Sequence, residues 1–198
     1  GIGLALAEHY ARTGATLGLA ARRADRLAGL AATLRTLGAS AVHSYPLDVA
    51  DVDALCHAAE EFTRQTGTPD IVIANAGVSS GTLTEHQEDL AVIRRILEIN
   101  VFGMAATFSP FIAAMQKRGS GRLVGIASVA GIRGLPGAEA YSASKAAAIA
   151  YLESLRLEMR PSGVKVVTIA PGYIETPMTA HNPYPMPFML PANEAADR

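Results

Sequence analysis

The sequence is poor in the residues that build disulfide-bonded or metal-stabilised folds. Its 198 residues include one cysteine, Cys56, and no tryptophan. A single cysteine excludes an intrachain disulfide and a cysteine-rich zinc site, and we expect Cys56 to be a small packing residue. The His, Asp and Glu residues show no metal-ligand spacing, so we expect no metal site.

The sequence also lacks an excess of charge of either sign. It has 17 Lys and Arg against 18 Asp and Glu, a formal net charge of -1 at pH 7. This balance does not favour nucleic acid or an anionic membrane as a partner. Hydrophobic residues make up 49% and charged residues 18%, a composition that excludes a disordered chain.

No targeting segment and no long apolar run are visible. The first residues contain neither a methionine nor a basic leader, so they do not resemble a signal peptide. The longest uncharged stretch, residues 99–116, contains Asn100 and Pro110 and falls short of the roughly 18 apolar residues that a membrane span needs. We therefore expect a core helix there and, with the lone cysteine, a cytoplasmic protein.

Helix and strand patterns alternate over the first 170 residues. Hydrophobic spacing predicts helices over 3–13, 24–37, 51–65, 87–115 and 141–159, and strands over 16–21, 41–47, 71–74, 122–127 and 165–170. We expect the long helix to bend near Gly103 or Pro110, and the apolar strand 16–21 to be buried on both faces. The alternation predicts the α/β class: a doubly wound, Rossmann-like parallel sheet in one domain, residues 1–198.

Both ends of the sequence depart from this pattern. A doubly wound nucleotide fold opens with a strand that leads into a glycine turn, whereas this chain begins at Gly1-Ile2-Gly3. We expect that it is part of a longer chain, whose first strand would lie mid-sheet between two neighbours. After Pro171, closely spaced prolines predict irregular structure, and we expect a lid over the active site at about residues 176–192.

The glycines at the start suggest a dinucleotide-binding turn, although two glycines at this spacing also occur in flexible segments. The residue that reads the ribose lies about 20 residues further on, which here is Ala21, followed by Arg22 and Arg23. The Arg22 guanidinium can hold a 2′-phosphate by two parallel hydrogen bonds, with an attraction of about 4 kcal/mol at 4 Å before desolvation. We predict NADP over NAD; alternatively, both arginines are solvated charges at a helix start.

Two further segments could line the cofactor. Asp48-Val49 follows a predicted strand, where the carboxylate could accept a hydrogen bond from the adenine amino group or cap a helix. Asn75-Ala76-Gly77 follows the next strand, where small residues let the backbone approach a cofactor closely or form an ordinary turn.

Ser128, Tyr141 and Lys145 give the strongest chemical signal. Tyr141 and Lys145 are four residues apart on a predicted helix and share one face. An ammonium nearby would lower the tyrosine pKa from about 10 by roughly three units, and an oxidised nicotinamide would add a second positive charge. We therefore predict that Tyr141 is a general acid/base. Ser128 ends a strand, where its hydroxyl could hold a substrate carbonyl or alkoxide.

Taken singly, these residues are a strand-ending serine, a helix-face tyrosine and a solvated lysine; in combination they favour a catalytic site.

Together with residues elsewhere in the sequence, these three resemble the motifs of the short-chain dehydrogenase/reductase family, and the resemblance extends over nearly the whole chain. The residues that carry the resemblance are Gly1-Ile2-Gly3, Asn75-Ala76-Gly77, Asn100, Ser128, the segment YSASK at 141–145, and Pro171-Gly172. The family implies a Rossmann-type domain, a nicotinamide cofactor and hydride transfer between it and a carbonyl or alcohol.

The resemblance also implies residue roles. Tyr141 would be the acid/base, Ser128 would stabilise the reacting oxygen, and Lys145 would bind the nicotinamide ribose and lower the tyrosine pKa. Asn100 would support a water in a proton relay. The positions implied to contact the nicotinamide end are Pro171, Gly172 and Thr176. The family further implies a homodimer or homotetramer, with the helices over 87–115 and after Tyr141 at the interface.

The substrate is expected to be a small carbonyl or alcohol compound. Residues 178–190 are rich in Met, Phe, Tyr and Pro, which suggests an apolar or lipid-like molecule, unless these side chains pack on the protein itself. The leading prediction is an NADP-dependent oxidoreductase. The alternatives are a non-catalytic NADP-binding regulatory protein and a non-redox epimerase or dehydratase on the same fold.

Overall fold

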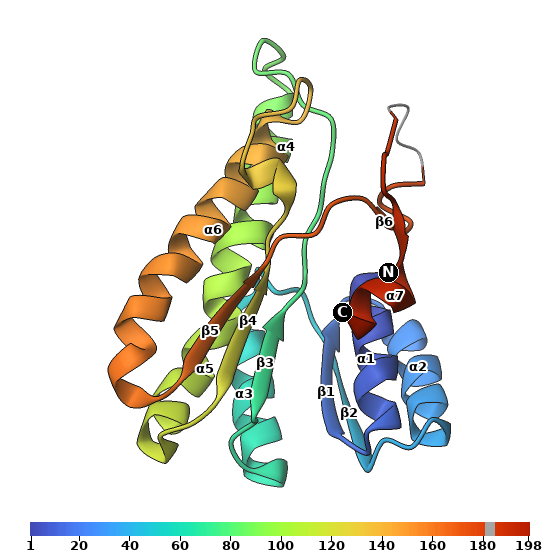
Figure 1. Ribbon diagram of the computed structural model, residues 1–198, viewed down its shortest axis with the longest axis vertical. Helices are drawn as coiled ribbons and strands as arrows, with labels where there is room; N and C mark the ends of the chain where they lie inside the picture. Colours follow the sequence, from blue (N-terminus) through green and yellow to red (C-terminus); the bar gives the residue numbers. More distant parts are fainter. Residues whose placement is uncertain (181–184) are drawn as a thin grey trace. The chain divides into compact units, whose positions relative to one another are not determined.

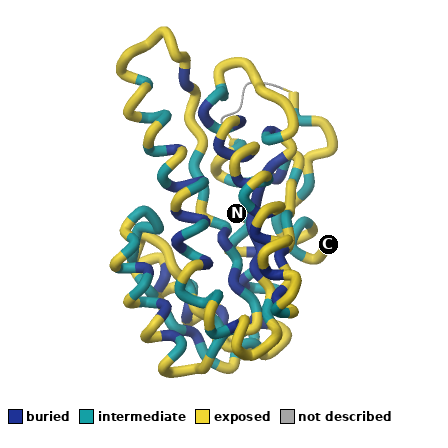
Figure 2. Tube along the Cα trace, turned by 90° about the vertical axis from the view of Figure 1, so that its left-hand side faces the viewer, coloured by how far each residue is buried: buried dark blue, intermediate teal, exposed yellow. Residues whose placement is uncertain are grey.

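Parallel strands alternate with helices along most of the chain (Figure 1). The computed structural model describes residues 1–180 and 185–198. They form two compact units: a terminal unit of residues 1–66 and the described part of 173–198, and a central unit of residues 67–172. Buried residues follow the strands and the inner helix faces, whereas most loop residues are exposed (Figure 2).

In residues 1–66 of the terminal unit, two parallel strands are joined by a helical crossover. Strand β1 is paired with β2 from Thr16 opposite Ala41 to Ala21 opposite Pro46. The elements of this part are α1 (Ile2–Arg12), β1 (Thr16–Ala21), α2 (Ala24–Thr36), β2 (Ala41–Pro46) and α3 (Val52–Thr66). Alanines of α1 pack with Leu34 of α2 and Val42 of β2 to form a small core.

Strand β1 is not buried on both faces, so that expectation is wrong. Leu17 and Leu19 pack against the small core, whereas Thr16, Gly18 and Ala20 are exposed. Successive side chains of a strand point to opposite faces; the leucine face meets the small core, whereas the other face, at Gly18, approaches the ring of Phe62 in α3 and is otherwise exposed.

The central unit is built on a three-stranded parallel sheet in the order β3-β4-β5. Its strands are β3 (Ile71–Ala74), β4 (Arg122–Ile126) and β5 (Lys165–Ile169), and its long helices are α4 (Asp89–Leu97), α5 (Gly103–Arg118) and α6 (Glu139–Met159). The helices cover one face of the sheet, and Phe108, Leu123 and Leu152 are among the fully buried core residues (Figure 1). Parallel strands with helical crossovers confirm the Rossmann-like α/β class.

Glycine lets α6 approach this sheet closely. A Cβ at Gly125 of β4 would overlap the side chain of Leu152. At the other end of the sheet, the Arg118 guanidinium donates to the carbonyl oxygens of Thr68 (2.7 Å) and Pro69 (2.8 Å), which fixes the turn before β3. A 3-10 turn, η3 (Arg160–Ser162), connects α6 to β5.

A π-helical turn, η1 (Glu98–Phe102), interrupts the long helical region between α4 and α5. It ends directly before Gly103, one of the two predicted positions of a bend, whereas Pro110 lies inside α5. A π turn carries an extra residue and often occurs at functional sites. Here it buries Asn100 completely.

The same helical region, Asp89–Arg118, is long and apolar enough to cross a membrane when judged by length and composition alone. Its residues Met104, Phe108 and Met115 are buried in the central core. This packing agrees with the predicted core helix.

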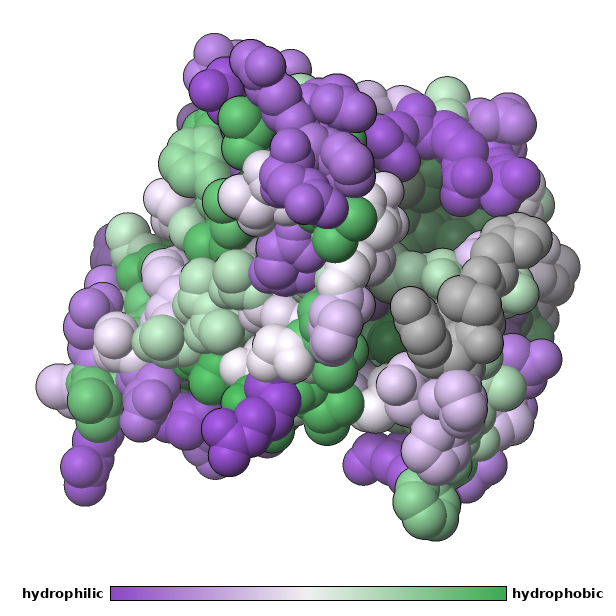
Figure 3. Space-filling model, turned by 90° about the horizontal axis from the view of Figure 1, so that it is seen from above, coloured by the Kyte–Doolittle hydropathy of each residue, from purple (hydrophilic) through white to green (hydrophobic). Residues whose placement is uncertain are grey.

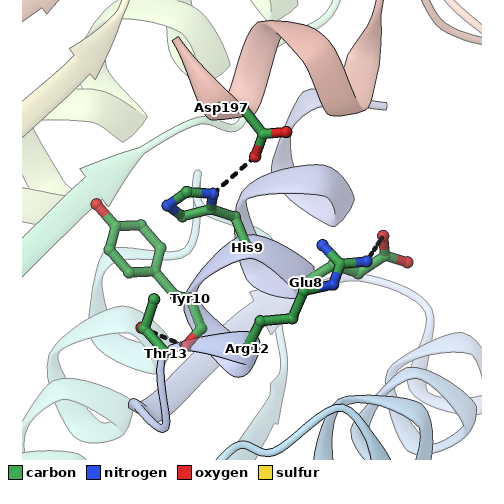
Figure 4. A network of polar contacts seen from close by, with 6 residues as sticks. All are labelled: Glu8, His9, Tyr10, Arg12, Thr13 and Asp197. Carbon is green, nitrogen blue, oxygen red and sulfur yellow. Dashed lines mark hydrogen bonds and ion pairs between the residues drawn. The ribbon is translucent and has the colours of Figure 1, made fainter.

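Regular structure is present after Pro171, so the prediction of wholly irregular structure is wrong. Strand β6 (Ile174–Glu175) pairs with β7 (Leu190–Pro191), and α7 (Ala192–Asp197) follows. The strands have only two residues each, and Pro191, with φ -58°, precedes the first helical residue, where a proline is tolerated. Helix α7 contacts α1, with His9 Nδ1 2.8 Å from Asp197 Oδ1 (Figure 4). Residues 181–184 of the predicted lid lie outside the described residues.

Candidate active site

The loop after β4 carries Ser128 at the carboxyl end of the sheet. Ser128 precedes a 3-10 turn, η2 (Val129–Gly131), and its Oγ accepts a hydrogen bond from the Ala130 N–H at 3.1 Å. The side chain is buried, and a second hydrogen bond joins it to the hydroxyl of Tyr141. The strand-ending serine and the helical tyrosine, 13 positions apart, are therefore in direct contact.

Tyr141 and Lys145 lie one turn apart on α6. The Lys145 Nζ is 5.7 Å from the centre of the Tyr141 ring, and it donates a 2.7 Å hydrogen bond to the Ile126 carbonyl oxygen. Only 4% of Lys145 is exposed, an unusual position for an ammonium group. The structure thus brings together Ser128, Tyr141 and Lys145.

Burial shifts the pKa of both titratable groups. Desolvation lowers the pKa of Lys145 to about 8. Desolvation also raises the pKa of Tyr141 above its ordinary value, while the hydrogen bond with Ser128 acts in the opposite direction. We predicted a lowered pKa for Tyr141. With the protein's own groups alone, the pKa of Tyr141 is raised instead, because the cost of burying a phenolate dominates. At neutral pH, Tyr141 is therefore a phenol and Lys145 is mostly an ammonium.

Asn100 connects a loop to helix α6 beside this group. Its Oδ1 accepts from the Val78 N–H (2.8 Å), and its Nδ2 donates to the Val78 carbonyl (2.9 Å) and to Ser144 Oγ (2.9 Å). Ser144 Oγ in turn donates to the Tyr141 carbonyl oxygen at 2.7 Å. Asn100 thereby ties the segment after β3 to the first turns of α6. Its implied role in a water relay stays a prediction.

Sequence reasoning missed Ser144. The signal lay within the YSASK segment, because a hydroxyl three residues after Tyr141 lies on the adjacent helical turn and can reach its carbonyl oxygen. Its partner Asn100 is 44 residues away, so their contact is visible only in the tertiary structure.

Two more predicted segments lie beside these residues in the central unit. A Cβ placed on Gly77, which follows β3 in the segment Asn75-Ala76-Gly77, would lie 3.4 Å from Asn100 Oδ1 and 3.5 Å from Lys145 Nζ. Near Ser128, the Val129 N–H donates to the Pro171 carbonyl oxygen at 3.1 Å. The Asn75–Gly77 segment and Pro171-Gly172 therefore belong to the same neighbourhood as the polar residues.

The other predicted cofactor positions lie in the terminal unit. Gly1 precedes α1, and a Cβ on it would lie 3.4 Å from Thr176 Cγ2, so these two predicted positions are adjacent. The first turn of α1 contains no acidic residue. The predicted positions in this unit are Gly1, Ile2, Gly3, Arg22, Asp48, Val49 and Thr176.

Asp48 is not the cap of α3. Its Oδ1 accepts from the Ala50 N–H at 3.0 Å, which forms a local turn. The cap interaction of α3 comes from Asp51, whose Oδ1 accepts from the Ala54 N–H at 3.0 Å. The helix-cap alternative for Asp48 is therefore wrong.

The chain is similar to proteins of known class. Residues 1–185 match the family model described as short chain dehydrogenase. An uncharacterized oxidoreductase of Myxococcus xanthus (strain DK1622) is 39% identical over 197 residues, covering 100% of this chain and 77% of the relative. The 11-beta-hydroxysteroid dehydrogenase-like 2 protein of Arabidopsis thaliana is 38% identical, covering 90% of this chain and 58% of the relative, so the chain spans little more than half of that protein.

Solved structures show the same likeness. An alcohol dehydrogenase from the archaeon Thermococcus sibiricus, complexed with 5-hydroxy-NADP, has a TM-score of 0.87 at 28% identity, covering 100% of this chain and 83% of that chain. An NAD+-bound xylitol dehydrogenase has a TM-score of 0.88 at 27% identity, covering 99% of this chain and 85% of that chain.

Proposed function

The chain belongs to the short-chain dehydrogenase/reductase family, and from that premise we propose that it transfers a hydride between NADP(H) and a carbonyl or alcohol substrate. Oxidoreductase chemistry with a nicotinamide cofactor follows from the family. The observation that carries the proposal is the contact of the Ser128 and Tyr141 side chains beside the buried ammonium of Lys145.

The protonation states suit the reduction of a carbonyl. When bound, the cofactor supplies the hydride that is added to the carbonyl carbon. The Tyr141 phenol donates a proton to the carbonyl oxygen, and the Ser128 hydroxyl holds that oxygen by a hydrogen bond while negative charge develops on it. The Lys145 ammonium stabilises the phenolate that remains on Tyr141 after the transfer.

The residues present fit a nicotinamide dinucleotide. The N-terminus of α1, at Gly1, Ile2 and Gly3, offers backbone N–H groups without a nearby first-turn carboxylate, which suits a pyrophosphate. Asp48 and Val49 would contact the adenine. In the central unit, the residues that would hold the nicotinamide part are Asn75, Ala76, Gly77, Lys145, Pro171 and Gly172; in the terminal unit, Thr176 is the position that the family resemblance implies for a nicotinamide contact.

Exposed apolar side chains near Ser128 support an apolar substrate. Ile132, which follows η2, is 65% exposed, and its neighbours Val129 and Leu135 are also exposed. Figure 3 shows apolar residues, in green, on the surface among hydrophilic ones, in purple. Relatives named hydroxysteroid dehydrogenase-like agree with an apolar carbonyl compound.

The proposed function is tested by the loss of NADPH absorbance with a panel of aldehydes and ketones of increasing apolar size. We expect turnover, with kcat/KM at least about tenfold higher for NADPH than for NADH, because one good charge-assisted pair contributes more than about 1.4 kcal/mol. Cofactor binding without turnover of any carbonyl would instead favour the regulatory alternative.

Arg22 is the residue expected to set the preference for NADPH. It is exposed and follows β1 directly after the uncharged Ala21. Arg22→Ala should raise KM for NADPH about tenfold and leave KM for NADH nearly unchanged, and Arg23→Ala is the matched control. An unaltered KM for NADPH in Arg22→Ala would assign the arginine to the solvated helix start.

We also propose a homodimer or homotetramer formed through the long helices of the central unit. Phe102 of η1 and Leu157 of α6 are 57% and 66% exposed, although both are large and apolar. Sedimentation at micromolar concentration should show a dimer or larger; a monomer alone would contradict the proposal.

A further inference from the structure

The turn that follows Ser128 packs directly on the backbone of the helix that carries Tyr141 and Lys145. A Cβ on Gly131 would lie 2.6 Å from the carbonyl carbon of Lys145, 2.7 Å from its carbonyl oxygen and 2.8 Å from the backbone nitrogen of Ala146. These atoms belong to the interior of a 21-residue helix and cannot rotate away as a side chain would. Only glycine allows this approach.

The same turn fixes the hydroxyl of Ser128. Ser128 Oγ accepts from the Ala130 N–H at 3.1 Å, and the Ser128 carbonyl oxygen accepts from the Gly131 N–H at 3.0 Å. Ser128, Ala130 and Gly131 therefore form one hydrogen-bonded unit, and a displacement of Gly131 displaces the serine hydroxyl.

A second attachment lies further along this loop. The Leu135 N–H donates to Ser142 Oγ at 3.3 Å, and Ser142 is buried in the first turns of α6. The loop from Ser128 to Leu135 is thus held on α6 at two places, at Ser142 and at the backbone of Lys145 and Ala146.

We propose that Gly131 is a positioning residue: its missing side chain sets the distance between the Ser128 hydroxyl and the Tyr141 hydroxyl. The inference rests on the proposed function, because it assigns a role within that reaction. Gly131 acts through Ser128 and touches neither the cofactor nor the substrate in this role. An added methyl group would separate the turn from α6 and lengthen the Ser128–Tyr141 hydrogen bond, which weakens steeply with distance and angle.

The loop offers a matched control. Gly134 lies three residues later, and a Cβ there would meet nothing within 4 Å. In the carbonyl assay with NADPH, Gly131→Ala should lower kcat at least about tenfold with KM for NADPH within twofold of the wild type, because each factor of ten is about 1.4 kcal/mol. Gly134→Ala should leave both constants within twofold. Equal kcat in the two variants would overturn the proposal.

A double-mutant cycle separates positioning from general damage. Ser128→Ala should lower kcat much less in the Gly131→Ala background than in the wild type, because the serine contact is already impaired there. Additive effects would overturn the proposal. If Gly131→Ala fails to fold, Ser142→Ala provides the test of the proposal. This substitution removes the hydrogen bond from the Leu135 N–H to Ser142, the second attachment of the loop, and adds no steric overlap. We then expect a severalfold fall in kcat at unchanged KM for NADPH, and an unchanged kcat would contradict the inference.

One measurement does not depend on turnover. The Ser128 hydrogen bond acts to lower the pKa of Tyr141, so its loss in Gly131→Ala should raise that pKa further. Ultraviolet titration of tyrosinate, with Tyr141→Phe subtracted, should show the rise in Gly131→Ala and not in Gly134→Ala. If Gly131→Ala shows this rise but the wild type turns over no carbonyl, the proposed function alone is contradicted. If the wild type is active but Gly131→Ala shows no rise, the role of Gly131 is contradicted.

Discussion

Replacing Tyr141 by phenylalanine is expected to lower kcat for carbonyl reduction by about 10²- to 10⁴-fold, the range that a positioned general acid contributes. The variant keeps the ring and loses only the hydroxyl, which is joined to Ser128 and is a phenol at neutral pH. KM for NADPH should stay within about threefold. The measurement is steady-state kinetics with the carbonyl substrate found in the panel assay.

Tyr151 provides the control on the same helix. Its side chain is partly buried against the central core, and burial raises its pKa as well, but in the part of the chain that the structure describes it forms no hydrogen bond with Ser128 or Lys145. Tyr151→Phe should therefore retain nearly full kcat. Comparable losses in both variants would mean that the effect comes from helix packing, and proton donation by Tyr141 would then be excluded.

Replacing Lys145 by methionine is expected to remove activity and to stabilise the protein. The fall of the Lys145 pKa from 10.5 to about 8 corresponds to roughly 3 kcal/mol of lost stability at pH 7, at about 1.4 kcal/mol per pH unit. Methionine fills a similar volume without a charge to desolvate. The lost hydrogen bond to Ile126 offsets part of the gain, so we expect a net stabilisation of about 1–2 kcal/mol in urea unfolding.

The pH dependence of stability provides a signed test of the same residue. Between pH 8 and 10.5 the unfolded chain keeps the Lys145 proton and the folded chain releases it. The free energy of unfolding of the wild type should therefore rise with pH in this window, relative to Lys145→Met, by up to about 1.4 kcal/mol per pH unit. Lys165→Met, which changes an exposed lysine on β5, is the control and should follow the wild type. Parallel curves for wild type and Lys145→Met would refute burial of the charge.

Local patterns predicted most of the fold. The strands over 16–21 and 71–74 have the predicted bounds, and the predicted α1 to α3 and α6 lie within two residues of the observed ends. The alternation of helical and extended periods is a property of short segments, so it can be recognised without knowing what the segments contact. The β6–β7 pair escaped prediction because two-residue strands carry no period, and α7 escaped it because its 6 residues make fewer than two helical turns.

Long-range contacts decided the details of the site. The π turn of η1 buries Asn100, and no residue type within it predicts a π turn rather than an α-helical one. Gly131 meets the backbone of α6 through folding alone, since nothing in its local sequence distinguishes it from Gly134. The tyrosine pKa also depends on burial, and a nearby lysine in the sequence does not reveal how much water the fold excludes.

The amino-acid sequence by itself determined the order of helices and strands, the placement of Tyr141 and Lys145 on one helical face, and the family resemblance, because each depends on spacing along the chain. Only the tertiary structure decided that Ser128 touches Tyr141, that Asn100 holds Ser144 and that the lysine ammonium is buried. Those relations depend on which distant segments exclude water from one another, and spacing along a chain carries no record of that exclusion.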